Sequence, residues 1–173
     1  KLGGIAIQDM HSAEGALELE MFIAMDPPKH DQQRKAVTPA VAPSNLLLLE
    51  PTIRERACQI LDDLPIGEEF DWVDKVSIEL TTMTLATLFD FPWEERRKLT
   101  RWSDVTTAAP ETGIVASYEA RREELIECAM YFKGLWDQRV NEPPRNDLIS
   151  MMAHAPATKD MPFLEFLGNL LLL

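Results

Sequence analysis

Apolar side chains recur every three or four residues along most of the chain, which is the period of an amphipathic helix. Together with the prolines and polar residues that start and stop each run, this spacing predicts helices over residues 26–39, 51–64, 72–91, 93–107, 117–140, 147–153 and 162–173. No segment shows a convincing alternation of apolar and polar residues, although the connector 65–71 has room for a short strand. The pattern therefore predicts a mainly α fold.

The same pattern indicates which helix faces are buried. In the helix 51–64, the buried face is expected to comprise Ile53, Ala57, Ile60, Leu61 and Leu64. In the longest helix, 117–140, the inner positions are expected to be Leu125, Cys128, Ala129, Phe132, Leu135, Trp136 and Val140. The helix 72–91 has apolar residues around most of its circumference, so we expect it to be central and surrounded. A turn is predicted at Pro43, and Pro51 is expected to open the following helix.

The two ends suggest that the chain is an internal piece of a longer protein. It begins at Lys1 without an initiator Met or a signal-peptide pattern. It finishes on four leucines, in a helical run without a glycine stop or a basic last turn. That run is too short to cross a membrane, which takes about 20 apolar residues, so no transmembrane anchor is predicted. We expect residues 1–173 to be a single partial domain.

Charge and cysteine content argue against several classes of protein. The 173 residues include 17 Lys and Arg against 29 Asp and Glu, a formal net charge of −12. This acidity disfavours nucleic-acid binding, because few cations are available to neutralise phosphates. Cys58 and Cys128 form neither a disulfide framework nor a zinc site, and are typical of reduced thiols in a cytoplasmic protein. His11, His30 and His154 lack the spacing of metal ligands.

One polar pair indicates chemistry. His30 and Arg34 stand four residues apart in a predicted helix, so their side chains lie on one face, one turn apart. Such a pair can grip an anion from one side, since a guanidinium presents a planar fork of donors. Spacing alone favours an ordinary polar helix face over an anion site, and the residues around the pair change that interpretation.

Those residues resemble a known signature. The segment with Asp26, Pro28, His30 and Arg34 is similar to the Asp-x-Pro-x-His-x-x-x-Arg pattern in the C helix of bacterial cytochromes P-450, the haem-thiolate monooxygenases. In that family the His and Arg contact the two haem propionates. The family often has Phe where this chain has Val41, a difference that concerns packing and leaves the propionate contacts untouched.

The resemblance continues along the chain, from the loop before helix C to the first turns of helix I. Segments similar to the family's helices E, F, G, H and I are found at 69–92, 94–104, 117–142, 146–154 and 163–170. They are most similar to the subfamily of bacterial enzymes that hydroxylate medium-chain alkanes at the terminal carbon. The resemblance therefore implies part of the P-450 fold, with little β structure.

The resemblance implies a cofactor, a reaction and partners. The cofactor would be haem (heme b), the reaction O₂-dependent hydroxylation of an alkane or another apolar substrate, and the electron donors a ferredoxin and its reductase. The acid–Thr pair, the Glu-x-x-Arg pair and the Cys that binds iron would lie beyond Leu173. Neither Cys58 nor Cys128 lies in a comparable loop, so this chain holds no catalytic residue and is expected to be inactive alone.

Two further sets of residues follow from the same resemblance. The substrate pocket would be lined by Gly4, Ile5, Ile7, Phe22, Val105, Leu167 and Leu171. The face that receives the acidic ferredoxin would include Lys29, Lys35, Arg54 and Arg56. Complementary charge would speed such an encounter and make it sensitive to salt.

A second function remains open from composition and helical pattern alone. An acidic, helical chain with an apolar core also fits a ligand-binding module without enzymatic activity. That alternative does not explain why the His-x-x-x-Arg segment is followed in order by the other family-like strings.

Overall fold

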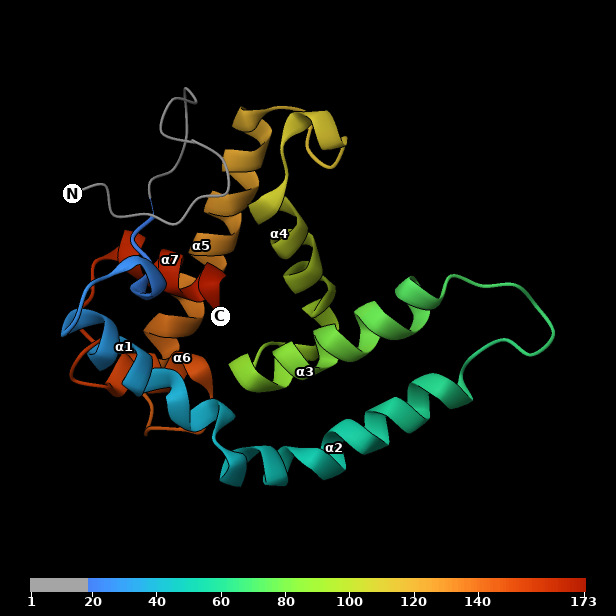
Figure 1. Cartoon of the computed structure of the whole chain (residues 1–173), viewed down its shortest axis with the longest axis horizontal. Coiled ribbons are helices and arrows are strands. Elements are labelled where there is room, and N and C mark those ends of the chain that lie inside the picture. Colours follow the sequence, from blue (N-terminus) through green and yellow to red (C-terminus); the bar gives the residue numbers. More distant parts are fainter. Residues whose placement is uncertain (1–18) are drawn as a thin grey trace.

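The computed structural model describes residues 19–173, and within them every regular element is helical (Figure 1). The α-helices are α1 (Lys29–Val37), α2 (Pro43–Asp62), α3 (Glu79–Phe89), α4 (Arg97–Thr107), α5 (Tyr118–Val140), α6 (Leu148–His154) and α7 (Phe163–Leu172). Single 3₁₀ turns occur at Phe22–Ala24, Thr38–Val41, Trp93–Glu95 and Pro110–Thr112, and a π-helical stretch, Val73–Ile78, leads into α3. The predicted α fold is confirmed.

The helices form a packed body with an arm. The long helix α5 packs against α4 and α6, and α6 in turn contacts α1. The arm consists of α2 and α3, which lie side by side and are joined by the loop at the far right of Figure 1. The segment Phe22–Ala24 contacts both α1 and α7, so it lies between the two helices that carry the polar residues discussed below.

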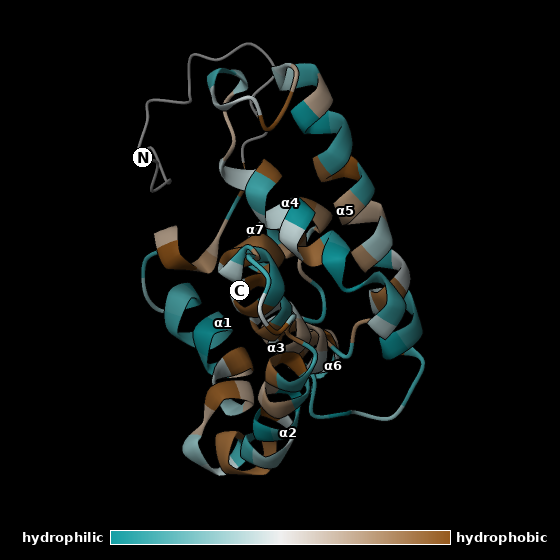
Figure 2. Ribbon diagram, turned by 90° about the vertical axis from the view of Figure 1, so that its right-hand side faces the viewer, coloured by the Kyte–Doolittle hydropathy of each residue, from teal (hydrophilic) through white to brown (hydrophobic). Residues whose placement is uncertain are grey.

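The core lies between α3, α5, α6 and α7. Its central aromatic group includes Phe91, Trp102 and Phe132, with the ring centroids of Phe91 and Phe132 5.6 Å apart and those of Phe91 and Trp102 6.2 Å apart. Ile149 of α6 is fully buried in the same cluster. Apolar positions dominate α7, which lies near the middle of the molecule in Figure 2. Burial of these faces, rather than helix propensity, holds the fold together.

The longest predicted helix is confirmed almost residue for residue. Ser117 caps α5, because its Oγ accepts a hydrogen bond from the amide of Ala120. The predicted inner positions Leu125, Cys128, Ala129, Phe132 and Leu135 are buried, and Trp136 is half-buried. The expectation for Val140 is wrong: it is 48% exposed, because it ends the helix where the chain leaves the core.

The expected turn at Pro43 and the helix start at Pro51 are both wrong. Pro43 is the first residue of α2, where a missing amide proton costs little, and Pro51 lies inside the helix. Of the expected face only Ile60 is buried, and Leu61 is 50% exposed. The reason is that α2 contacts few elements, mainly α3, and the rest of its surface faces outward.

The helix predicted over 72–91 is confirmed as continuous helix over 72–89, π-helical at Val73–Ile78, but it is less enclosed than expected. No strand forms in 65–71, and the α-helical part begins only at Glu79. Trp72 and Val73 are 54% and 59% exposed, because this end lies on the arm, away from the core. The other end is buried, with Phe89 packed edge-on against Phe132.

The two cysteines are expected to differ sharply in reactivity. Burial raises the pKa of the Cys128 thiol to about 12, whereas Cys58 is exposed on α2. Because the thiolate is the reactive form, maleimide at pH 8 should label Cys58 and leave Cys128 untouched until the protein is denatured. Peptide mass mapping checks this, with a C58S variant as control. Labelling of native Cys128 at the rate of Cys58 would contradict the buried position of this part of α5.

Candidate functional site

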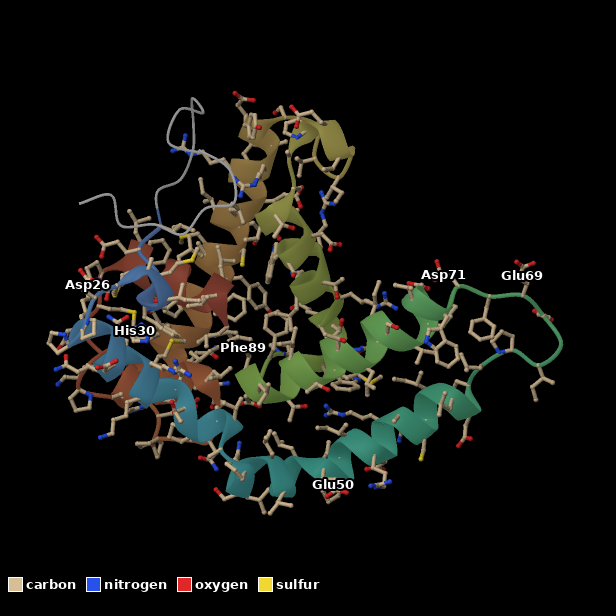
Figure 3. All side chains as sticks on the ribbon, viewed as in Figure 1. Asp26, His30, Glu50, Glu69, Asp71 and Phe89 are labelled. Atoms are coloured by element: carbon tan, nitrogen blue, oxygen red, sulfur yellow. The ribbon has the colours of Figure 1, made fainter. Side chains whose placement is uncertain are left out.

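His30 and Arg34 lie on the same face of α1, one helical turn apart, as the sequence predicts. The helix begins directly after Pro28, which occupies its N-cap position and needs no amide proton there. Arg34 lies in the last turn, where the negative end of the helix dipole favours a cation. Figure 3 shows His30 on the side of the molecule opposite the loop that carries Glu69 and Asp71.

The imidazole of His30 is oriented by the main chain. Its Nδ1 lies 2.7 Å from the carbonyl oxygen of Phe22. A carbonyl oxygen can only accept a hydrogen bond, so Nδ1 carries the proton and donates. No hydrogen-bond partner of Nε2 lies among residues 19–173, so this nitrogen is the one available to a ligand.

The guanidinium of Arg34 has no partner in the part of the chain that the structure describes. The side chain is exposed and makes no hydrogen bond or ion pair with any residue from 19 to 173. One face of α1 therefore presents two nitrogen groups, one turn apart, that can receive oxygen atoms of an anion.

A buried polar cluster on the neighbouring part of α1 was missed by the sequence analysis. Gln33 of α1 donates from Nε2 to Oε1 of Glu165 and accepts at Oε1 from Nδ2 of Asn169, at 2.8 Å. Lys29, one turn before Gln33, donates to Oε2 of Glu165 at 2.7 Å. Two pairs with (i, i+4) spacing therefore face each other, one on α1 and one on α7. Gln33, Glu165 and Asn169 are each at most 3% exposed.

The same cluster binds the segment before α1. The amide of Phe22 donates to Oδ1 of Asn169 at 2.8 Å in a buried hydrogen bond. Phe22 is therefore held by α7 at its amide and by His30 at its carbonyl. The hydrogen bond to Glu165 raises the pKa of Lys29, so the ammonium group of this ion pair stays charged.

A sequence signal for this cluster existed. Glu165 and Asn169 are polar residues at (i, i+4) spacing in the otherwise apolar run of α7. Polar residues on an apolar helix face need partners when they are buried. Lys29 and Gln33, with the same spacing on α1, were available, but nothing in the sequence says that these two helices meet.

The residues predicted for a substrate pocket lie mostly in the core. Phe22 and Leu167 belong to the main cluster, Val105 to a second cluster beside α5, and Leu171 packs against both. Gly4, Ile5 and Ile7 lie outside the described residues. The pocket itself stays a prediction.

The residues of the predicted basic face lie in different surroundings, and the face itself stays a prediction. Lys29 is paired with Glu165, and Arg54 with Glu50 at 2.8 Å. Arg56 turns inward: it donates to the carbonyl oxygen of Met83 at 2.6 Å, and its guanidinium lies 4.6 Å from the ring centre of Trp93. Burial lowers the pKa of Arg56. Lys35 is exposed on α1 and has no acidic partner among the described residues.

A cavity of about 490 Å³ is lined by neither His30 nor Arg34, although Arg56 of the predicted basic face lies in its wall. Its walls come from α2, α3, α5 and the turn after α3, and comprise Arg56, Ala86, Thr87, Asp90, Phe91, Pro92, Trp93, Leu135, Gln138 and Arg139. None of the predicted pocket residues contributes to it. In residues 19–173, moreover, no helix combines the length and apolar character needed to cross a membrane.

Comparison with known proteins identifies the family. No protein-family model matches the chain. Among curated proteins, it is 31% identical over 152 residues to linalool 8-monooxygenase of Pseudomonas putida, covering 87% of this chain and 37% of that protein. It is also 31% identical over 149 residues to a steroid C26-monooxygenase of Mycolicibacterium smegmatis, covering 86% of this chain and 34% of the relative.

Two solved structures are more similar in sequence to this chain than these two curated proteins are. Cytochrome P-450-153 from Novosphingobium aromaticivorans is 49% identical with a TM-score of 0.78, over 90% of this chain and 37% of that one. CYP153D17 from Sphingomonas sp. PAMC 26605 is 47% identical with a TM-score of 0.84, over 98% of this chain and 43% of that one. The chain thus spans little more than a third of the curated relatives, and its helices match part of their fold. It belongs to the cytochrome P-450 family.

Proposed function

We propose that the whole protein is a haem-dependent monooxygenase that hydroxylates medium-chain n-alkanes at the terminal carbon. The monooxygenase part is supported by family membership. The alkane substrate is supported by the resemblance of the strings at 69–92 and 117–142 to the alkane-hydroxylating subfamily, and by 47–49% identity to the two P-450-153 structures. A ligand-binding module without enzymatic activity finds no support among the relatives reported above.

The observation that carries the proposal is the pair of donors on α1. A haem has two propionate groups, and His30 and Arg34 offer two nitrogen groups one turn apart, neither of them used by another residue from 19 to 173. The residues present therefore fit the edge of a haem. Charge-assisted hydrogen bonds to carboxylates are shorter and about twice as strong as neutral ones. When bound, haem supplies the iron at which O₂ is activated.

The remaining residues of this chain supply a dry, apolar wall. An alkane has no group that can form a hydrogen bond, so its binding rests on apolar burial, about 0.8 kcal/mol for each CH₂. We propose that Leu171, half-buried between the two core clusters, contributes to that wall together with Phe22, Val105 and Leu167. Selection of a terminal methyl group then requires a narrow approach to the iron.

We also propose that electrons arrive from a ferredoxin and its reductase. On this chain the supporting residues are now Arg34 and Lys35, the exposed basic side chains of α1 that have no acidic partner among the described residues. Lys29 remains 51% exposed but is neutralised by Glu165, and Arg56 is unavailable because it packs against Trp93. A smaller basic surface than the sequence suggested would therefore meet the acidic partner.

The proposed function is tested by haem retention in the full-length protein. His30→Gln and Arg34→Gln each remove a hydrogen bond to a carboxylate, worth about 1.5–3 kcal/mol, so each variant is expected to release haem roughly ten to a hundred times faster. Transfer of haem to an excess of apomyoglobin measures the rate. Lys35→Gln is the matched control, since it removes an exposed cation from the same helix. Release at the wild-type rate from both variants would overturn the proposal.

A further inference from the structure

We propose that Asn169 is a positioning residue for His30 and acts through the main chain of Phe22; this inference rests on the proposed function. Asn169 lies on α7, far from His30 in sequence, and is 1% exposed. Its Oδ1 accepts the amide proton of Phe22 at 2.8 Å, and the carbonyl oxygen of Phe22 accepts from Nδ1 of His30 at 2.7 Å. The amide and the carbonyl group of Phe22 thus link Asn169 on α7 to the imidazole of His30.

The second contact of Asn169 makes this link rigid. Its Nδ2 donates at 2.8 Å to Oε1 of Gln33, which lies on α1 three residues after His30. Asn169 therefore holds both α1 and the segment to which the ring of His30 is bound. Because both hydrogen bonds are buried, neither is readily replaced by water. The amide of Asn169 fixes the position of Phe22 relative to α1, and with it the direction of the His30 ring.

The consequence for a ligand concerns the second ring nitrogen. While Nδ1 is bound to the carbonyl of Phe22, the imidazole cannot turn, and Nε2 keeps one direction. A carboxylate at this edge then meets a group that is already oriented, which reduces the entropy lost on binding. Without the bond from Phe22 to Asn169, the segment can shift and the ring loses its anchor.

A double-mutant cycle separates positioning from simple stability. Asn169→Leu preserves the volume and removes both hydrogen bonds, and we expect it to release haem about tenfold faster in the full-length protein. In a His30→Gln background the same substitution should add little, because the group through which it acts is gone. The measured quantity is the rate of haem transfer to apomyoglobin.

Thr82→Val provides the matched control. Thr82 is also 1% exposed, and its hydroxyl forms a part-buried hydrogen bond with that of Thr100, 2.7 Å away between α3 and α4. Losing this bond should lower stability without changing haem release. Asn169→Asp is a second variant in case the leucine form does not fold, because it keeps the oxygen that accepts from Phe22 and should retain haem better than the leucine form.

The outcomes are distinct. The inference would be overturned if Asn169→Leu accelerated haem release equally with and without His30→Gln, or if Thr82→Val accelerated it as much as Asn169→Leu does. Either result would show a merely structural role for Asn169. The proposed function would still be supported in that case by faster haem release from His30→Gln. Haem loss from Asn169→Asp as fast as from Asn169→Leu would also overturn the inference. Wild-type haem release from His30→Gln alone would also overturn the inference, whereas wild-type release from both His30→Gln and Arg34→Gln would refute the proposed function.

Discussion

Replacing Gly168 by alanine is expected to destabilise the protein by about 3 kcal/mol, the upper end of the usual cost of overpacking. Gly168 lies on α7 where the main chain of Glu20 crosses it. A Cβ there would overlap the carbonyl oxygen of Glu20 and lie 2.8 Å from its carbonyl carbon. A flexible side chain could move aside, but this is backbone. It cannot retreat without breaking the neighbouring hydrogen bond from Phe22 to Asn169.

Gly134→Ala is the matched control, and we expect it to raise rather than lower the free energy of unfolding. Gly134 lies on the exposed side of α5, and a Cβ added there meets nothing within 4 Å. Removing a glycine from the interior of a helix should stabilise the protein by about 0.5–1 kcal/mol. Urea unfolding followed by circular dichroism measures both changes. If the two variants shifted the midpoint in the same direction, the close approach of Glu20 to α7 would be wrong.

Replacing Arg139 by methionine is expected to cost about 3–5 kcal/mol, as for other buried ion pairs that lose one partner. The Arg139 side chain is 6% exposed and connects three elements. It donates to the carbonyl oxygen of Asp90 at 3.2 Å and to Oδ2 of the same residue at 2.8 Å, and its Nε lies 3.6 Å from Oδ2 of Asp147. The Asp147 side chain, 5% exposed, would lose its buried cationic partner and keep only the partly exposed guanidinium of Arg145, 3.8 Å away.

The neighbouring arginine supplies the control for this prediction. Arg145 pairs with Asp90, Glu142 and Asp147, but its side chain is 43% exposed. Exposed ion pairs contribute about 0–1 kcal/mol, so Arg145→Met should shift the unfolding midpoint only slightly. Urea unfolding of the two variants tests whether burial, rather than the number of acidic neighbours, sets the cost. Equal losses from both variants would refute that interpretation.

Helix positions were predictable wherever local signals agreed. The start at residue 117, the apolar stripe from Leu125 to Leu135 and the end at Val140 all lie within a few turns of one another, and the structure confirms them. The errors at Pro43 and Pro51 arose because proline was interpreted as a boundary. In α2 one proline occupies the first position and the other is tolerated inside, since a helix can lose one hydrogen bond and continue.

The candidate site was predictable only in part. His30 and Arg34 could be found because their spacing is local and the segment around them resembles a known signature. Lys29 was identified as a surface residue for a partner, yet it pairs with Glu165. An exposed lysine and one that neutralises a buried carboxylate look alike in a sequence.

By itself, the sequence determined the helical class, the positions of most helices and the placement of His30 and Arg34 on one helix face, because each depends on residues within a few turns of one another. Tertiary structure alone decided that Lys29 and Gln33 meet Glu165 and Asn169, that Gly168 lies against Glu20, and that Arg56 turns inward onto Trp93. The physical reason is the distance along the sequence between the residues that interact. Periodicity tells which face of a helix is polar or apolar, whereas the partner across a helix interface, 136 positions away for Lys29 and Glu165, depends on how whole helices pack.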